Sequence, residues 1–428
     1  MKAALIVSAT LTIGWGAVGH AQESRHEEEI RTLLARPEIQ AAFRAIERLE
    51  PRTQRDLITL TEIPAPPFKE EQRAQYFAEL LVEAGADTVY IDEVGNVIAR
   101  RRGTGVGRTI AIAGHMDTVF PEGTDVSVRQ RGDTLFAPGV GDDTRGLMVV
   151  LTVLRAMQET GVRTEADLLF IGTVGEEGLG DLRGVKNLFK EGSPTIDSWI
   201  AVDGGDIGRI VSSGLGSHRY RVTFEGPGGH SWGAFGIGNP AHAMSRAIKA
   251  FDDAARTYVA EGPRTSYNVG RIGGGTSINS IPFSVWMEVD MRSESNQRLL
   301  GIDSIFQASI HQAVDEQNAT RRSGGPLTAK IEMIGDRPSG TADPSTPLIA
   351  RAVASARSFG REPSLGVSST DSNIPIALGI PAITIGRGGA GGGGHSLREW
   401  WLNQDGHIAI QYALTLLVAE AVLAQAVP

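Results

Sequence analysis

The chain of 428 residues is long enough for two or three domains, each with a hydrophobic core of its own. Its 41% hydrophobic and 21% charged residues are ordinary for a soluble globular protein and argue against disorder over most of the length. A net charge of −9 at pH 7 disfavours a nucleic-acid partner, and the absence of cysteine excludes disulfides and thiolate metal ligands.

The N-terminal segment, residues 1–21, has the pattern of a secretory signal peptide. Lys2 precedes an apolar stretch that ends near Val18, and small residues follow up to Ala21. We expect cleavage after Ala21 and therefore a periplasmic or secreted protein. The alternative, a membrane anchor, is disfavoured because the apolar run is short and the charged segment 23–31 follows it. We expect no stable membrane association.

Residues 22–213 are predicted to form the first part of an α/β domain, because strand-like and helix-like segments alternate along them. The predicted elements, apart from four apolar strands described below, are helices over 26–50, 53–60, 69–84 and 144–159, and a hairpin over 88–101 that turns at Gly95 and Asn96.

From about residue 214 the pattern becomes that of a small two-layer domain. Tyr220, Val222 and Phe224 alternate with polar residues, as in a half-exposed strand. The predicted elements are strands over 218–225, 266–272 and 284–292, and helices over 240–258 and 297–316. Their β-α-β-β-α order predicts a lid over residues 214–325, inserted into the larger domain, which resumes over 326–428.

Four apolar, strand-like runs each lead into residues that can bind a metal. They are TIAIAG before His115 and Asp117, DLLFIGTV before Glu176 and Glu177, SWIAV before Asp203, and PAITIG before a loop that carries His395. Ligands in open α/β sheets gather at the carboxyl ends of the strands. We therefore expect these residues to converge, although they are far apart in the sequence.

His115 and Asp117 are two residues apart at a strand end and so point to the same side. One can bind a metal through its imidazole while the other orients it with a hydrogen bond. A purely structural pair is the alternative, because His-x-Asp is common; the wider GHMDTVFP sequence favours the functional interpretation.

Asp142 and Asp143 in GVGDDTRG come just before a predicted helix. The alternative to a metal site is a helix N-cap with an acid in the first turn, but a cap explains only one of the two carboxylates. Asp142 is the candidate for a carboxylate that bridges two cations.

Glu176 and Glu177 follow a buried strand, where adjacent carboxylates repel each other unless cations neutralise them. We expect Glu177 to be a ligand and Glu176 to be the general base that transfers a proton from water to a leaving amine. A salt-bridged surface pair is the alternative.

Asp203 and His395 both lie beside glycines. Asp203 precedes Gly204 and Gly205, which permit a close approach of backbone to a site; a simple Asp-Gly turn is the alternative. His395 ends the stretch RGGAGGGG, which can also be a flexible linker or a phosphate cradle. A loop wrapped around bound substrate explains both the glycines and the histidine.

The candidate donors are nitrogen and oxygen atoms only. Such a set suits Zn²⁺ best, and also Co²⁺ or Mn²⁺. Two divalent ions would lower the pKa of a shared water toward about 7 and polarise a carbonyl, and amide hydrolysis needs both effects.

In this order, the motifs GHMDTV, GDDTRG, GEEG, the Asp203 turn and GGGGHS resemble those of the M20 family of metallopeptidases. This family includes peptidase T, glutamate carboxypeptidase, aminoacylase-1, and the acetylornithine and succinyl-diaminopimelate deacylases. The resemblance extends from about residue 50 onward. It implies a mixed-sheet α/β zinc-hydrolase catalytic domain with an inserted α+β lid, or dimerisation, domain.

The resemblance also implies a role for each candidate residue. One metal would be held by His115, Asp142 and Asp203, the other by Asp142, Glu177 and His395, with Glu176 as catalytic base and Asp117 supporting His115. A homodimer formed through the lid is a further expectation from this resemblance.

Three lid residues match substrate-binding positions of the family. His230 in GPGGHSWG corresponds to a histidine that holds the substrate carbonyl, often in the neighbouring subunit; Asn279 in INSIP and Arg292 in DMRS match further lid positions. An arginine suits a substrate carboxylate, although structural roles for Asn279 and Arg292 are the alternative. After His230 the sequence departs from the family pattern, with Trp232 and Phe235 among the replacements, which leaves the substrate preference open.

The leading hypothesis is a two-metal hydrolase that cuts an amide bond in short peptides, as a di- or tripeptidase-like exopeptidase. The first alternative is a deacylase of N-acyl amino acids. The second is a metal-binding protein without catalysis, which the presence of Glu176 disfavours. A third, a two-metal aminopeptidase of another family without a lid, is disfavoured by the predicted insertion.

Overall fold

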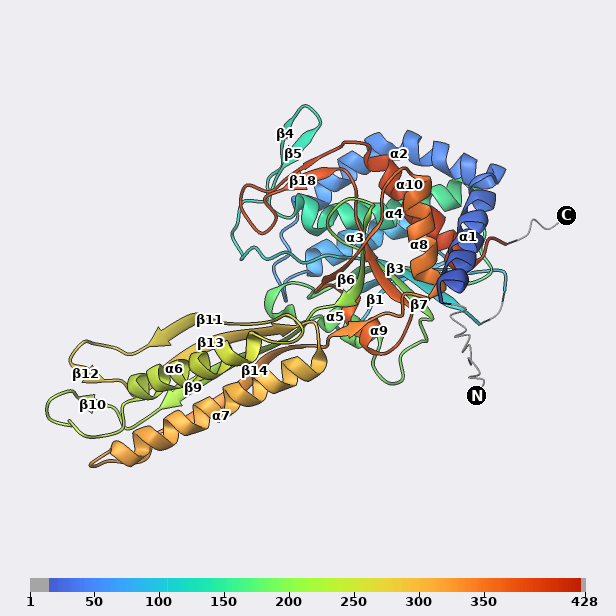
Figure 1. Cartoon of the computed structure of the whole chain (residues 1–428). Coiled ribbons are helices and arrows are strands. Elements are labelled where there is room, and N and C mark those ends of the chain that lie inside the picture. The colour runs from blue at the N-terminus through green and yellow to red at the C-terminus, as the bar shows by residue number, and fades with distance from the viewer. Residues whose placement is uncertain (1–14, 106, 425–428) are drawn as a thin grey trace, which may run out of the picture.

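The computed structural model describes residues 15–105 and 107–424 (Figure 1). Residues 1–14, most of the expected signal peptide, lie outside the described residues, and the expected cleavage after Ala21 falls within α1 (Trp15–Leu34). Signal cleavage therefore stays a prediction. None of the helices described is both long and apolar enough to cross a membrane.

The larger of two main sheets has nine strands, in the order β1-β2-β6-β3-β7-β17-β8-β15, with β16 paired to β8. Its central strands β6 (Asp167–Thr173), β3 (Thr109–His115), β7 (Ser198–Val202) and β17 (Ala382–Ile385) are parallel neighbours, and they are the four apolar runs of the sequence. Outer strands such as β2 and β8 pair antiparallel with them, so the sheet is mixed as expected. Parallel strands end at one edge, which brings the residues that follow them together.

Helices cover both faces of this sheet. Figure 1 shows α2 (Pro37–Thr61), α4 (Gly146–Thr160) and α10 (Gly406–Ala421) stacked on one side. Helix α4 is apolar nearly all round, because it lies between the sheet and the outer helix α2 and has no face in water. The short helices α5 (Arg183–Leu188) and α9 (Asn373–Ala377) contribute to a smaller core on the other face.

The boundaries predicted for the first helices, 26–50 and 53–60, are wrong. The chain breaks between α1 and α2 instead, where Arg36 is extended (φ −69°, ψ 131°) and Pro37 opens the next helix. A residue before proline avoids the helical region, whereas proline itself fits the first position of a helix. Helix α2 then continues through Pro51 to Thr61.

The smaller main sheet forms an elongated arm with two long helices on one face (Figure 1). Its strands lie in the order β11-β13-β9-β14 and all pair antiparallel. The predicted β-α-β-β-α order omitted the fourth strand, β14 (Thr328–Arg337), which pairs with β9 (Gly216–Glu225) although it lies beyond residue 325. Ala329, Ile331 and Met333 alternate with Lys330 and Glu332, but only Gly335 and Arg337 of this strand are buried. We call this arm, residues 216–337, the lid.

The core of the lid is separate from the large core and comprises apolar side chains such as Phe224 on β9, Phe251 on α6 and Phe306 on α7. The other lid elements are α6 (Pro240–Val259), α7 (Asn296–Thr320), β10 (Gly229–His230), β11 (Thr265–Gly274), β12 (Ser280–Ile281) and β13 (Ser284–Ser293).

The remaining helices are α3 (Glu71–Glu83) and α8 (Pro347–Ser358). The remaining strands are β1 (Thr88–Ile91), β2 (Val97–Arg101), β4 (Arg129–Arg131), β5 (Thr134–Phe136), β8 (Arg209–Gly214), β15 (Gly340–Thr341), β16 (Ser364–Ser368), β18 (Ala390–Gly392) and β19 (Trp400–Leu402). The predicted hairpin is β1 and β2, whose turn is held by the Asp92 side chain.

Candidate metal centre

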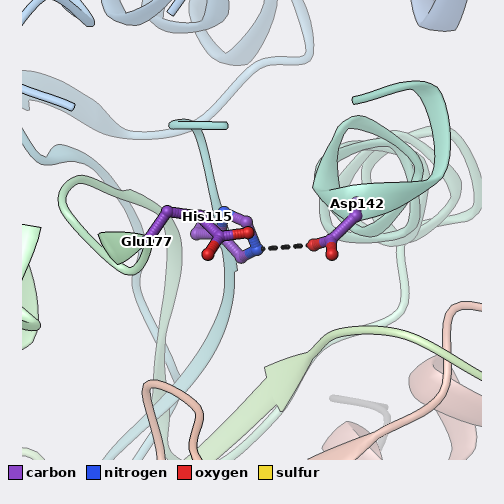
Figure 2. Close-up of side chains that lie close together, drawn as sticks. All are labelled: His115, Asp142 and Glu177. Atoms are coloured by element: carbon purple, nitrogen blue, oxygen red, sulfur yellow. Dashed lines mark hydrogen bonds and ion pairs between the residues drawn. The ribbon is translucent and has the colours of Figure 1, made fainter. Parts of the chain in front are cut away.

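Asp142 lies between two histidines, His115 and His395, that are far apart in the sequence. Its Oδ1 is 3.0 Å from Nε2 of His115, and its Oδ2 is 3.2 Å from Nε2 of His395. Figure 2 shows the imidazole of His115 directed at the Asp142 carboxylate. Burial alone would raise the pKa of Asp142, but hydrogen bonds from both histidines lower it below its ordinary value. Each oxygen of one carboxylate therefore faces its own nitrogen donor, as a bridging ligand requires.

The adjacent Asp143 accounts for the helix-cap alternative. Its Oδ1 accepts the Gly146 N–H at the start of α4 (3.2 Å), and its Oδ2 accepts the His115 backbone N–H (3.2 Å). Asp142 itself has a non-helical backbone (φ −110°, ψ 96°), which frees its carboxylate from the helix. Asp143 therefore caps the helix, and the Asp142 carboxylate is available to face the two histidines.

Glu177 completes the group of acids and imidazoles. Its Oε1 is 2.9 Å from Nε2 of His395, and ligand atoms of His115, Asp142 and Glu177 lie within 4.8 Å of one another. Hydrogen bonds to Asp142 and Glu177 raise the pKa of His395 to about 10. The carboxylates therefore favour a positive charge at this point, and a cation would supply one.

His115 is oriented by the chain that follows it. Its Nδ1 donates to the backbone carbonyl of Asp117 over 3.0 Å, which leaves Nε2 free to face Asp142. The Asp117 carboxylate is farther from Nδ1, at 3.7 Å. The expected support of the histidine therefore comes mainly from the backbone of Asp117.

The Asp117 carboxylate holds the loop that carries the two glutamates. Its Oδ1 accepts the Glu176 N–H (3.0 Å) and its Oδ2 accepts the Glu177 N–H (2.8 Å). Asp117 is fully buried, so these hydrogen bonds fix the loop against β3. The residue connects the first and the third metal-binding motifs of the sequence.

Glu176 is buried beside an arginine that the sequence analysis did not single out. Burial raises the pKa of Glu176 well above its ordinary value, and the charge of Arg337 opposes this shift. Nη1 of Arg337 donates to Glu176 Oε1 over 3.2 Å, and Nη2 donates to the Glu176 backbone carbonyl. Arg337 ends β14, a strand that the sequence analysis did not include, although Ala329, Ile331 and Met333 alternate with charged residues there.

Asp203 follows β7 at the same edge of the sheet and is partly buried. Burial raises the pKa of Asp203, and the negative charge of Asp142 raises it further. All five expected ligands therefore gather at one edge of the large sheet. Their donors are imidazole nitrogen and carboxylate oxygen, a set that fits divalent ions such as Zn²⁺.

A family model described as peptidase family M20/M25/M40 matches residues 111–419, nearly the whole span from β3 to α10. The chain belongs to this family. Membership of this class of hydrolases, which the motifs predicted, is therefore confirmed.

Individual relatives of this M20 protein differ in the activity that they are named for. A succinyl-diaminopimelate desuccinylase of Corynebacterium glutamicum is 26% identical over 56% of this chain and 66% of its own length, just under two thirds. Carboxypeptidase G2 of a Pseudomonas species is 26% identical over 67% of this chain and 68% of its own. The solved structure of aminopeptidase PepT from Bacillus cereus has a TM-score of 0.67 and 21% identity, and covers 86% of this chain and 98% of its own. That likeness confirms the fold.

The three lid residues of this M20 protein do not lie together. His230 on β10 and Asn279 before β12 are neighbours at the far end of the arm, where Ser231 N–H donates to the Asn279 carbonyl (2.9 Å) (Figure 1). Arg292 is at the opposite end of β13, paired with Ser217. A ten-residue strand extends about 33 Å, so one small substrate cannot contact both ends of the lid in this arrangement.

Arg292 instead joins a charged group at the base of the lid. Asp290 accepts from Arg292 Nε (2.8 Å) and from Arg219 Nε (2.9 Å), and Arg219 also donates to the carbonyl of Gly178. Gly178 directly follows Glu177, so this group lies against the loop of the metal centre.

Proposed function

We propose that this protein is a two-metal hydrolase that cuts an amide bond in short peptides. The observation that carries the proposal is the Asp142 carboxylate, whose two oxygens face imidazoles from two different chain segments. A single carboxylate in this position can bridge two cations about 3.5–4 Å apart, as two-metal hydrolases require.

The donors divide naturally into two sets around Asp142. His115 and Asp203 would complete one site; Glu177 and His395 would complete the other. Zn²⁺ fits these donors best, and Co²⁺ or Mn²⁺ are alternatives. When bound, such ions supply a Lewis acid that polarises the amide carbonyl and lowers the pKa of water.

Glu176 is the group that moves the proton in this proposal. Its carboxylate accepts a proton from the attacking water and delivers it to the nitrogen of the leaving fragment. Arg337 binds both its Oε1 and its backbone carbonyl, and Asp117 binds its backbone N–H. These contacts fix the direction from which the proton is taken.

The lid would supply contacts to the substrate. His230 and Asn279 are exposed at the tip of the arm, and we propose that they reach a metal centre either when the lid closes or across a homodimer. Arg292, at the base of the lid, would favour a carboxylate on the substrate. The tip and the base of the lid would then contact different groups of the substrate.

The second candidate is a deacylase of N-acyl amino acids. The desuccinylase among its relatives favours it, because that protein is named for removal of an acyl group, whereas carboxypeptidase G2 is named for peptide cleavage. Both reactions break an amide bond and would use the same metal centre. The pattern of residues 1–21 leads us to propose that either activity operates in the periplasm or outside the cell.

The test is hydrolysis of a mixed panel of di- and tripeptides and N-acetyl amino acids by the mature, metal-loaded protein. We expect release of amino acids by the wild type, and a loss of about 10²–10⁴-fold in Glu176→Gln, with bound metal unchanged. Greater turnover of the N-acetyl compounds would favour the deacylase.

The outcome that contradicts a hydrolase is two bound metals without turnover across the panel. That result would favour the non-catalytic metal-binding protein. Equal turnover by wild type and Glu176→Gln would show that Glu176 is not the general base. It would not contradict the metal site.

A further inference from the structure

Glu399 is a buried carboxylate next to the metal centre that none of the steps above uses. It lies four residues after His395, immediately before β19, and only 2% of it is exposed. Its Oε2 accepts the Gly139 N–H (2.8 Å), and its Oε1 accepts the N–H groups of Gly141 (2.9 Å) and Asp142 (2.8 Å). The carboxylate thus binds three backbone groups of the loop that ends in Asp142.

The loop is shaped to wrap around this carboxylate. Gly139 has a φ of +77°, a conformation that glycine adopts without steric cost. A Cβ on Gly141 would lie 3.1 Å from Glu399 Oε1 and 2.6 Å from Nη2 of Arg387. The GVG sequence before Asp142 therefore permits an approach that larger residues would obstruct.

The hydrogen bonds of the Glu399 carboxylate go to this loop, whereas its backbone N–H donates to the Ser396 carbonyl (3.1 Å). Within residues 15–105 and 107–424, no lysine, arginine or histidine forms a salt bridge with Glu399. Hydrogen bonds from backbone N–H groups to a carboxylate are short and strong because the acceptor is charged. Burial raises the pKa of Glu399, and the backbone N–H groups of the loop that positions Asp142 partly offset this shift.

We propose that Glu399 is a positioning residue that sets the Asp142 loop against the segment carrying His395. Asp142 and His395 are donors of the same metal site in the proposed function, on which this inference rests. Glu399 is linked to Asp142 by a hydrogen bond and to His395 by three intervening residues. It fixes the distance between the two donors without contacting the ion or the substrate.

The first experiment compares metal binding by the wild type and Glu399→Gln, using Zn²⁺ competed against a chromogenic chelator. The amide cannot accept all three N–H groups, because its NH₂ is a donor. We expect the affinity to fall by roughly 10–100-fold, as for other residues that orient metal ligands. Co²⁺-loaded samples should also show a changed visible absorption spectrum.

Glu420→Gln is the matched control. Glu420 on α10 is also a buried glutamate, but its carboxylate accepts from Arg351 on α8 (2.7 Å) and from Arg108 before β3 (3.1 Å). These contacts involve none of the expected ligands. We expect this variant to lower the unfolding temperature of the metal-free protein while leaving Zn²⁺ affinity within about twofold of the wild type. Metal affinity, rather than stability, therefore separates positioning from a general structural role.

A double-mutant cycle with Asp142→Asn tests whether Glu399 acts through Asp142. Once Asp142 is a weakened ligand, we expect the loss on Glu399→Gln to shrink to less than about threefold. Additive losses would overturn the proposal, as would Zn²⁺ affinity in Glu399→Gln equal to that of Glu420→Gln.

Two outcomes are kept separate by the design. If the wild type binds no Zn²⁺, the proposed function itself fails; if the wild type binds two ions and Glu399→Gln binds them equally well, only the positioning role fails.

Should Glu399→Gln not fold, Glu399→Asp replaces it. That side chain keeps the charge but is one methylene shorter, so weaker Zn²⁺ binding is again expected, and unchanged binding contradicts the role.

Discussion

The metal-centre edge of the large sheet and the tip of the lid differ in how firmly their functional residues are held. At the sheet edge, Asp117 and His115 are buried and each makes defined hydrogen bonds. At the lid tip, His230 is exposed, and Trp232 and Phe235 beside it are 87% and 73% exposed. The side chains at the sheet edge are held by hydrogen bonds within the chain, whereas those at the lid tip are open to solvent.

This difference has a physical cause. Charged donors can be kept at a buried site only if hydrogen bonds or opposite charges compensate them, so the chain supplies a partner for nearly every one. Exposed side chains have no such requirement and can differ between relatives at little cost in stability. We therefore expect the reaction to take place at the sheet edge and the substrate preference to depend on the lid.

The largest effect that would test this comparison comes from the lid. We expect His230→Ala to lower kcat by about 10²–10³-fold, as for the loss of one donor to a developing oxyanion, without changing bound metal or the unfolding temperature. His242→Ala on α6, which replaces an exposed histidine of the same arm, is the control. Unchanged kinetics of His230→Ala would exclude the lid tip from the reaction.

Metal removal should separate the two regions directly. At free metal 100-fold above Kd, binding stabilises the folded protein by about 2.7 kcal/mol, so a chelator should lower the unfolding temperature. In hydrogen exchange, loss of protection is expected in residues 139–142, 175–178 and 393–396 but not in the lid tip, residues 229–235. Equal loss in all four segments would show that the lid is part of the same cooperative unit.

Asp117→Asn should loosen the loop that carries Glu176 and Glu177 at the metal-centre edge. The amide can accept only one of the Glu176 and Glu177 N–H groups, so we expect kcat to fall by about 10–100-fold with little change in KM. Asp125→Asn, in the exposed loop that follows, should leave activity unchanged, since its carboxylate accepts the Ser127 N–H and pairs with the exposed Arg129. A matching loss in both variants would contradict the role given to Asp117.

The smallest effect is expected on the surface of the lid. Lys249 and Asp253 form an i,i+4 ion pair on α6 at 2.5 Å, and both side chains are mostly exposed. Because water screens exposed pairs, Lys249→Ala should change the free energy of unfolding by less than about 0.5 kcal/mol in a urea titration. A loss above about 1 kcal/mol would show that this helix face is covered in solution.

Several features were predictable from residue patterns alone. The four apolar runs are continuous rather than alternating because both faces of their sheet are buried, and that pattern identified the strands β3, β6, β7 and β17. A polar residue directly after such a run lies at the sheet edge, which is why His115 and Asp203 could be placed from sequence. The alternation of Tyr220, Val222 and Phe224 likewise identified a strand with one exposed face.

Other features depend on contacts between residues that are distant in the chain, and no local pattern encodes them. Arg337 contacts Glu176 across 161 positions, and Glu399 contacts Asp142 across 257. The alternation of Ala329, Ile331 and Met333 is that of a strand, but only the pairing of β14 with β9 assigns it to the lid. Sequence determined which groups can bind a metal or accept a proton, through residue type and strand period. Only the tertiary structure decided which buried partners hold those groups and which lid residues share an end of the arm, because hydrogen bonding and burial are settled when distant segments pack together.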